Sequence, residues 1–325
     1  MSFEEEAARM RYLVTGGAGF IGSNTVDELV RRGHGVVVLD DLSSGKEENL
    51  AEIRSKITFI KGSVTDLEIV QKAMFQADYV IHLAARTSVP RSVKDPIDTN
   101  RINVDGTLNV LVAARDNKIK RYVFAASSSA YGETPTLPKS EDMPAVPISP
   151  YGVSKYVGEL YAQTFGRCYG LENVCLRYFN IFGPRQDPDS PYSGVLSRFA
   201  TAFLESTSPV VYGDGEQTRD FTFIENAVQA NILACEAPSA SGRIFNIGTG
   251  HSVTLNRVLR MFEKIAGKTV DVKYEPPREG DIRDSLADIR LAQEALGYEP
   301  TVLIEEGLER TYAWYQAQAA RKVAD

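Results

Sequence analysis

The sequence contains little cysteine and little histidine. Among its 325 residues are three cysteines, Cys168, Cys175 and Cys235, and three histidines. No Cys-x-x-Cys spacing occurs, so the chain lacks both a disulfide framework and the spacing of a metal site. We therefore expect no metal, interpret Cys168 and Cys175 as small core residues, and favour a reducing, cytoplasmic location.

Long apolar runs and an excess of positive charge are also missing. No run approaches the length of a membrane span, and no signal-peptide core opens the chain. The formal net charge of -7 argues against nucleic acid and membranes as partners, although a small anionic ligand needs only local basic groups. With 43% hydrophobic and 24% charged residues, the composition is typical of a globular protein with a large core.

Short β-branched runs alternate with helical stretches through the first half of the chain. We expect strands at residues 11–15, 36–39, 57–60, 79–83, 122–125 and 174–178. Runs that are apolar on both faces and separated by helices indicate a parallel sheet covered on both sides. The pattern predicts an α/β protein with a Rossmann-like, doubly wound parallel sheet.

The character of the sequence changes near Gly183. Residues 183–220 are rich in Pro, Gly, Asp and Ser around a helix expected at 195–205, whereas a helix at 224–236 and a strand at 244–247 resume the earlier pattern. We predict a Rossmann domain over 10–182 plus 221–248, and a smaller α/β substrate-binding domain over 183–220 plus 249–325.

Three glycines, Gly16, Gly19 and Gly22, follow the first expected strand and open a helix. Glycine lets the backbone approach a pyrophosphate, which the helix N-terminus then stabilises. The second strand ends in Asp40, where a carboxylate accepts hydrogen bonds from a ribose 2′-hydroxyl and repels a 2′-phosphate. Asp41 strengthens that bias, so the sequence predicts NAD rather than NADP.

Tyr151 and Lys155 stand four residues apart at the start of an expected helix, with Ser149 as its cap and Pro150 at its first position. The two side chains then share one helix face. We expect the ammonium to lower the pKa of Tyr151 from its usual value of about 10, and a hydroxyl of the run 127–129 to share the proton. The result would be a general acid–base for a carbinol, although the spacing alone is also found in amphipathic helices.

Six motifs extend over nearly the whole chain: TGGAGFIGSN, HLAA, SSSAYG, SPYGVSK, RYFNIFGPRQ and DGEQTRDFTFIEN. With them the chain resembles the extended short-chain dehydrogenases/reductases, and within these the UDP-hexose 4-epimerases (UDP-glucose/UDP-N-acetylglucosamine 4-epimerase type). The resemblance implies an isomerase that holds NAD tightly and interconverts UDP-GlcNAc with UDP-GalNAc, and UDP-Glc with UDP-Gal, through a 4-keto intermediate.

The resemblance also implies which domain binds which ligand, and a homodimer. The Rossmann domain would bind NAD and the smaller domain the UDP-sugar. Helices near 97–117 and 151–169 would form the dimer, with Leu108, Leu111, Leu160 and Phe165 as candidate contacts that could equally face the sheet.

Cofactor contacts implied by the resemblance surround the pyrophosphate, the adenosine and the nicotinamide. They are Gly16, Gly19, Phe20, Ile21, Gly22, Asp40, Ser44, Gly45, Ser63, Val64, Leu83, Ala84, Ala85, Asn103, Tyr151, Lys155 and Tyr178. Ser63 departs from the family, which usually has an acid there, so adenine would be held by a hydroxyl and the backbone. We expect His82, at the end of an apolar strand, to be packed and hydrogen-bonded in place.

Catalysis and substrate binding are assigned in the same way. Ser127, Tyr151 and Lys155 would be catalytic, and the implied substrate contacts are Ser88, Ser127, Ser128, Ser129, Tyr151, Asn180, Gly194, Val195, Tyr212, Arg219, Arg278, Asp281 and Ser285. Arg219 and Arg278 would clamp the diphosphate, because guanidinium groups donate bidentate bonds to phosphate. Ser285 replaces a bulky tyrosine of narrower epimerases, which implies room for a 2-acetamido group.

Other readings of the same scaffold differ at particular positions. Sugar-nucleotide 4,6-dehydratases usually carry an Asp-Glu pair in place of Ser128-Ser129. A UDP-uronic acid 4-epimerase (UDP-GlcA or UDP-GlcNAcA) or a UDP-glucuronate decarboxylase stays open, because Arg86, Arg91 and Arg185 would suit a carboxylate. A non-catalytic NAD-binding regulator would commonly lack the tyrosine or the lysine that this chain has.

Overall fold

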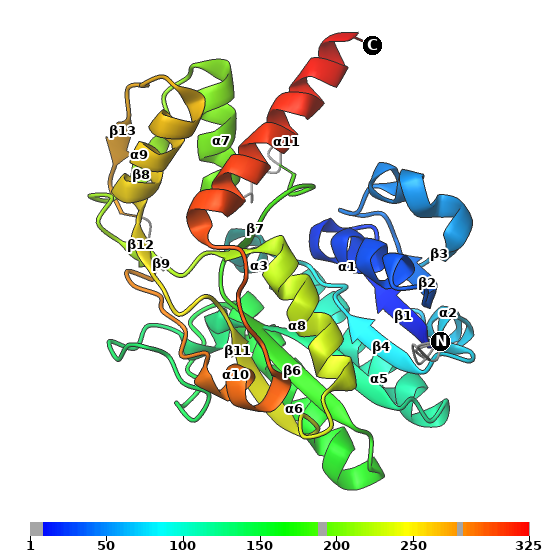
Figure 1. Cartoon of the computed structure of the whole chain (residues 1–325). Helices are drawn as coiled ribbons and strands as arrows, with labels where there is room; N and C mark the ends of the chain where they lie inside the picture. The colour runs from blue at the N-terminus through cyan, green and yellow to red at the C-terminus, as the bar shows by residue number, and fades with distance from the viewer. Residues whose placement is uncertain (1–8, 188–193, 278–281, 325) are drawn as a thin grey trace, which may run out of the picture.

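The computed structural model describes residues 9–187, 194–277 and 282–324, and its centre is one parallel sheet (Figure 1). The sheet has seven strands in the order β11-β6-β5-β4-β1-β2-β3. Their bounds are β1 Arg11–Thr15, β2 Gly35–Asp40, β3 Thr58–Lys61, β4 Tyr79–His82, β5 Arg121–Ser127, β6 Asn173–Tyr178 and β11 Arg243–Ile247. All its neighbouring strands run parallel, which confirms the predicted Rossmann-like architecture.

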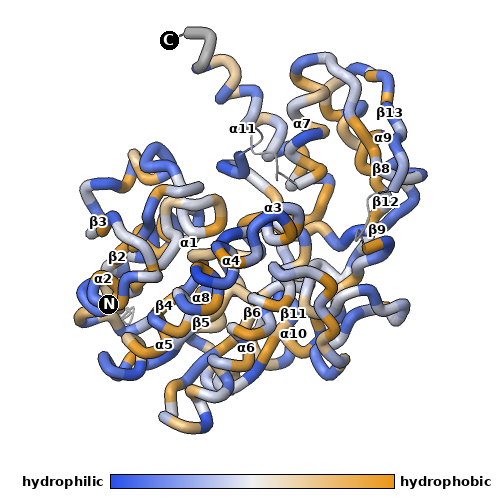
Figure 2. The backbone as a smooth tube through the Cα atoms, turned by 180° about the vertical axis from the view of Figure 1, so that it is seen from behind, coloured by the Kyte–Doolittle hydropathy of each residue, from blue (hydrophilic) through white to orange (hydrophobic). Residues whose placement is uncertain are grey.

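Helices cover both faces of this sheet (Figure 1). One face carries α1 (Phe20–Arg31) and α8 (Ile224–Glu236), and the other carries α2 (Leu67–Met74), α5 (Gly106–Asp116) and α6 (Pro150–Tyr169). Alternate strand residues serve the two cores: Val14 packs on the α1 side and Leu13 on the α2 side. Figure 2 shows hydrophobic and hydrophilic residues alternating along α5 and α6, as expected of helices with one buried face.

Shorter elements lie between the strands and the longer helices. A 3-10 segment at Glu47–Lys56 connects β2 to β3, and a 3-10 turn at Ser128–Tyr131 follows β5. Between β4 and α5 lie α3 (Val89–Lys94), α4 (Pro96–Asn100) and a π-helical turn at Arg101–Asp105. The π-helical turn continues directly into α5, and such turns often occur near functional sites.

Most of the remaining elements pack beside the carboxyl ends of the strands. They are β7 (Ile181–Phe182), α7 (Val195–Glu205), β8 (Val210–Tyr212), β9 (Thr218–Arg219), β10 (Thr222–Phe223), β12 (Val253–Thr254), α9 (Leu255–Ala266), β13 (Lys273–Glu275) and α11 (Ile304–Ala324). Helix α10 (Arg290–Leu296) packs instead against β11 and α8. The helices predicted at 195–205 and 224–236 appear with those bounds. One apolar cluster extends from Tyr12 in the sheet to Phe203 and Phe262 outside it, so both parts share a core.

Burial corrects several expectations about single side chains. Cys175 is buried as predicted, but Cys168 is exposed near the end of α6, so its assignment to the core was wrong. Leu111 and Phe165 are buried in the core on the α5–α6 side of the sheet, which leaves Leu160 as the exposed member of the predicted dimer contacts. None of the helices in the described part of the chain combines the length and apolar character that a membrane span requires.

Candidate active site

A cavity of about 620 Å³ opens at the carboxyl ends of β1, β2, β4 and β5. It lies where the strand order reverses between β1 and β4, the place where doubly wound folds bind ligands. Its wall includes most of the predicted cofactor and catalytic residues: Gly16, Gly19, Phe20, Ile21, Gly22, Asp40, Ser44, Val64, Leu83, Ala84, Ala85, Ser88, Tyr151, Lys155 and Tyr178.

The turn between β1 and α1 has no room for side chains. Gly16 has a φ of +69°, and a Cβ on it would lie 2.7 Å from the backbone nitrogen of Ala84. A Cβ on Gly22 would lie 2.1 Å from the carbonyl oxygen of Gly16. The N-terminus of α1 has no side-chain cap, so its free amides suit the pyrophosphate of a dinucleotide. The residues present therefore fit NAD.

Asp40 ends β2 with its carboxylate buried, at 7% exposure. Oδ2 accepts a hydrogen bond from the amide of Ala18 at 2.9 Å, and Oδ1 accepts one from the amide of Leu42 at 2.8 Å. Burial raises the pKa of Asp40, and the two backbone bonds oppose that shift. Gly45 lies against this carboxylate rather than in the cavity wall, so it fixes the place of Asp40.

Helix α6 presents Tyr151 and Lys155 from its first turns. Ser149 Oγ accepts the amide of Gly152 at 3.1 Å and proline occupies the first turn, as the sequence predicted. Lys155 is 4% exposed, and its Nζ donates to the carbonyl oxygen of Ala125 at 2.8 Å. Burial lowers the pKa of Lys155 to about 8.

The pKa of Tyr151 departs from the expectation. Burial raises it, and hydrogen bonding with Ser127 lowers it, so the net shift is upward rather than downward. The expected depression by Lys155 was wrong: desolvation of the phenol dominates, and the lowering contribution comes from Ser127. Lys155 directs its ammonium to the backbone of β5 instead.

The serine run turns at the end of β5. Ser127 Oγ accepts hydrogen bonds from the amide of Ser129 at 3.2 Å and from its hydroxyl at 2.9 Å. Ser128 is only partly buried, and none of the three serines lines the cavity itself. The contact with Tyr151 makes Ser127 the member that can share its proton.

Two predicted cofactor residues, Asn103 and Ser63, do not line the cavity. Asn103 is buried in the π-helical turn, where it accepts from the amide of Arg86 at 2.7 Å and donates to the Arg86 carbonyl at 3.1 Å and to Ser154 Oγ at 3.0 Å. Ser63 Oγ bonds the hydroxyl of Thr65 at 2.9 Å and does not line the cavity, whereas Val64 does. Asn103 therefore holds the loop after β4 in place.

His82 is packed in place, as predicted. Its Nδ1 lies 2.6 Å from Thr15 Oγ1 and its Nε2 3.0 Å from Thr107 Oγ1. Burial lowers its pKa to about 3, with a further contribution from the charge of Lys155. His82 is thus neutral and structural.

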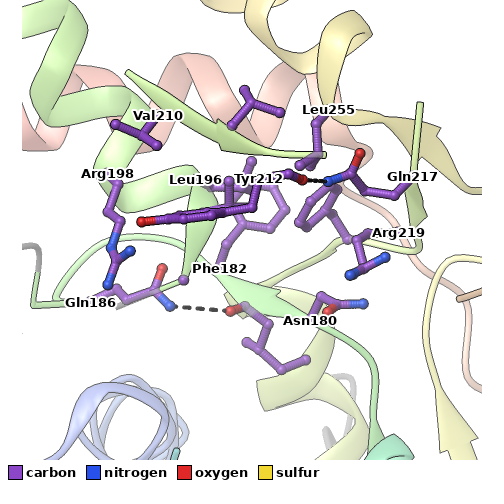
Figure 3. Close-up of a pocket in the computed structure, with 15 residues that line it drawn as sticks. Asn180, Phe182, Gln186, Leu196, Arg198, Val210, Tyr212, Gln217, Arg219 and Leu255 are labelled. Atoms are coloured by element: carbon purple, nitrogen blue, oxygen red, sulfur yellow. Dashed lines mark hydrogen bonds between the residues drawn. The ribbon is translucent and has the colours of Figure 1, made fainter. Parts of the chain in front are cut away.

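A second cavity, of about 260 Å³, adjoins the first (Figure 3). The predicted substrate residues in its wall are Asn180, Gly194, Val195, Tyr212 and Arg219. Ile181, Gln186 and Gly194 line both cavities, so the two adjoin and share part of their walls. The space therefore suits an extended ligand that reaches from Tyr151 to Tyr212.

Hydrogen bonds fix the polar groups of this second cavity. Asn180 Nδ2 donates to the carbonyl oxygen of Asp220 at 2.8 Å, and Arg219 Nη1 donates to the carbonyl oxygens of Thr218 and Arg283, each at 2.8 Å. Gln217 Nε2 donates to the carbonyl oxygen of Tyr212 at 2.5 Å.

Ser285, a predicted substrate residue, does not line either cavity. Ser285 is partly buried and donates its amide to the carbonyl oxygen of Thr218 at 3.2 Å, beside the second cavity rather than in its wall. Arg278 and Asp281 lie outside the described residues.

Several wall residues carry no signal in the sequence. Lys46, Asn49, Thr87, Gln186 and Asp187 line the first cavity and Arg198 the second, where Figure 3 places it on the opposite side of Tyr212 from Arg219. Lys46 and Asp187 form an ion pair at 3.2 Å. Gln186 falls within the motif RYFNIFGPRQ, but no role was assigned to it there, and the places of all six residues depend on tertiary packing.

Comparison with known proteins agrees with this geometry. Residues 12–248 match the family described as the NAD dependent epimerase/dehydratase family. UDP-glucose 4-epimerase of Mycolicibacterium smegmatis is 40% identical over 311 residues, which cover 94% of this chain and 99% of that protein.

Two solved structures have the same fold. UDP-N-acetylglucosamine 4-epimerase from Methanobrevibacter ruminantium M1, in complex with UDP-N-acetylmuramic acid, has a TM-score of 0.92 and 42% identity, over 95% of this chain and 99% of that one. UDP-glucuronic acid 4-epimerase from Bacillus cereus, in complex with UDP-glucuronic acid and NAD, has a TM-score of 0.89 and 32% identity, over 95% and 100%.

Replacing Asp40 by serine should weaken NAD binding by about tenfold or more and abolish discrimination against NADP, because the ribose loses its acceptor and a 2′-phosphate is no longer repelled. Calorimetric titration with both dinucleotides measures the effect. Asp41→Ser, at the exposed neighbour, should have a much smaller effect. An unchanged preference for NAD in Asp40→Ser would contradict the assignment.

Proposed function

Because the chain belongs to the NAD-dependent epimerase/dehydratase family, we propose that it interconverts UDP-GlcNAc with UDP-GalNAc, and UDP-Glc with UDP-Gal. It is an isomerase of the UDP-sugar 4-epimerase type that uses NAD. The choice of sugar and the residue roles are our proposal. The observation that carries it is that the cavity around Tyr151 and Lys155 adjoins the cavity around Tyr212 and Arg219 and shares wall residues with it.

We assign the two ligands to two parts of the chain. Residues 10–182 plus 221–248 would bind the cofactor through the glycine turn and Asp40. Residues 183–220 plus 249–325 would bind the UDP-sugar. The shared wall residues Ile181, Gln186 and Gly194 would lie where the sugar meets the nicotinamide.

NAD, when bound, would take hydride from C4 of the sugar and return it to the opposite face. Tyr151, as the phenolate, would take the proton of the sugar 4-hydroxyl on Oη and, as the phenol, give it back to the same oxygen. Ser127 would hold that hydroxyl through its own Oγ. Lys155 is protonated below about pH 8, so near neutrality its ammonium would stabilise the phenolate of Tyr151 and bind the nicotinamide ribose.

The nucleotide would be anchored at the far end of the space. In this proposal Arg219 and Arg278 would bind the diphosphate, and Asp281 would bind the uridine ribose. Tyr212 offers a ring for the uracil, and Arg198 offers a further guanidinium on the other side of that ring (Figure 3). Anchoring the diphosphate would leave the sugar free to rotate between the two hydride transfers.

A uronic acid is the second candidate substrate. Arg86, Arg91 and Arg185 all line the first cavity, and the Bacillus cereus structure contains UDP-glucuronic acid. However, Arg86 pairs with Asp98 at 3.1 Å and Arg185 with Asp27 at 2.6 Å, so two of these charges are already balanced. This favours an uncharged sugar.

Product analysis distinguishes the neutral UDP-sugars from the UDP-uronic acids as substrates. The enzyme is incubated with UDP-Glc, UDP-GlcNAc, UDP-GlcA and UDP-GlcNAcA, and the epimers are resolved by chromatography. We expect 4-epimers of the first two, with neither carbon dioxide nor net NADH. Turnover of the uronic acids alone, or release of carbon dioxide, would contradict the proposed substrate.

Tyr151→Phe should lower kcat by about 10²- to 10⁴-fold, since the general acid–base is lost while the ring remains. NAD affinity, measured in parallel, should stay within about twofold. Tyr156→Phe, on the same helix but outside the cavity wall, is the matched control and should turn over normally. Full activity of Tyr151→Phe would rule out the mechanism.

Ser285→Tyr should lower kcat/KM for UDP-GlcNAc by about tenfold or more, because a bulky ring would fill the space proposed for the acetamido group. UDP-Glc should be affected by less than about threefold, and Ser285→Ala should leave both sugars unchanged. An equal loss for both sugars would show that Ser285 does not select between them.

We propose a homodimer through one apolar face. Val93 on α3, Ile97 on α4, and Val153 and Leu160 on α6 are exposed large side chains, and α3 and α4 both pack against α6. Ile97 is the extreme case, at 80% exposure. Exposed apolar side chains grouped on elements that pack together are typical of an interface.

Ile97→Asp combined with Leu160→Asp should convert the dimer to a monomer, because two charges would be buried without partners. Light scattering reports the mass. Phe75→Asp, an exposed aromatic residue at the end of α2, is the control and should leave the dimer intact. A wild-type protein that is monomeric at high concentration would disprove the interface.

A further inference from the structure

A buried ion pair lies behind the first cavity. Arg177, on β6, donates from Nε to Glu159 Oε1 at 2.9 Å and from Nη2 to Oε2 at 2.7 Å. The exposures are 2% for Arg177 and 0% for Glu159, and neither residue lines either cavity. The mechanism proposed above gives this pair no role.

Glu159 belongs to the same helix face as the catalytic residues. It follows Lys155 by four residues and Tyr151 by eight, so the three side chains project from successive turns of α6. Arg177 holds the carboxylate by both oxygens, and its guanidinium lies 4.6 Å from the ring centre of Tyr131. The carboxylate is therefore held in place on the α6 face that also carries Lys155.

Lys155 needs such a partner because its ammonium is buried. Its Nζ is bonded to the neutral carbonyl of Ala125 and lies 5.1 Å from the ring centre of Phe124. Within residues 9–187, 194–277 and 282–324, no carboxylate comes within ion-pair distance of Lys155. Burying an ammonium without a compensating negative charge costs several kcal/mol, so the group would tend to lose its proton.

The other titratable groups around Lys155 do not supply that charge. Tyr151, on the same helix, is a neutral phenol whose pKa is raised. His82, on β4, is neutral, with a pKa of about 3. Arg177, on β6, is positive and paired with Glu159, and Glu159 raises the pKa of Lys155 against the effect of burial.

We propose that Glu159, held by Arg177, is a positioning residue for Lys155: its carboxylate keeps the buried ammonium protonated at the pH at which the enzyme works. This inference rests on the proposed function and deepens it. It also assigns Arg177 a task, since Arg177 keeps the carboxylate ionised and in place. Neither residue touches cofactor or substrate.

The test removes both charges together. Glu159→Gln combined with Arg177→Gln keeps the size and polarity of the pair and leaves no unpaired buried charge, which is the costly outcome. Two quantities are measured across neutral and alkaline pH: kcat/KM for epimerisation and the dissociation constant for NAD. The second does not depend on which sugar is the substrate, so a wrong substrate and a wrong role for Glu159 give different results.

Lys155 is charged below its pKa, and loss of Glu159 should lower that pKa. The alkaline fall of both profiles should therefore move to lower pH by about one unit. Glu159→Asp, which keeps the charge, should restore most of the wild-type profile. If the glutamine pair does not fold, Glu159→Met with Arg177→Leu removes the same charges with apolar side chains.

The control is another ion pair of the sheet region. Arg121 Nη2, in the first residue of β5, and Glu172 Oε2, in the residue before β6, are 2.6 Å apart. They lie at the amino ends of these strands, whereas Lys155 bonds Ala125 near the carboxyl end of β5. Arg121→Gln with Glu172→Gln should lower thermal stability without moving either pH profile. Unshifted profiles in the folded Glu159/Arg177 variant, or an equal shift in the Arg121/Glu172 variant, would overturn the proposal and reduce the pair to core packing.

Discussion

The close approach of α6 to β5 determines the rest of the site. A Cβ on Gly158 would lie 2.3 Å from Cζ of Phe124, so the helix can reach this strand only because position 158 carries no side chain. That distance lets Lys155 bond the carbonyl oxygen of Ala125. It also sets Tyr151 beside Ser127, at the end of the same strand. Geometry of this kind depends on backbone packing more than on any single polar contact.

Local chemistry explains what the sequence predicted well. The strands are apolar on both faces, as expected of a sheet that helices cover on both sides. Ser149 and Pro150 are residue types that favour the start of a helix. The glycines and Asp40 belong to one short strand–helix–strand unit, β1–α1–β2, so their positions follow from spacing along the chain. The packing of His82 was correctly expected from its place at the end of an apolar strand.

Side-chain direction and burial were not predictable in this way. Leu111 and Phe165 were candidate dimer contacts but lie in the core. A difference of one or two positions along a helix decides whether an apolar side chain faces the sheet or the surface. Desolvation raises the pKa of Tyr151, and the extent of that desolvation cannot be read from the sequence. Arg198 and the Lys46–Asp187 pair come from segments far apart in the chain, so only the folded arrangement brings them to the cavities.

The donor and the acceptor of each hydrogen bond of His82 follow from its neighbours. Thr107 Oγ1 donates to the carbonyl oxygen of Asn103 at 2.6 Å, so it must accept from His82 Nε2, and Thr15 Oγ1 in turn donates to His82 Nδ1. Thr15 also accepts from the amide of Ala84 at 3.3 Å. Every donor from the wall to the π-helical turn thus points the same way, and the bonds polarise one another. The loop after β4 is therefore held by a chain of neutral groups that adds no net charge and does not change with pH near neutrality.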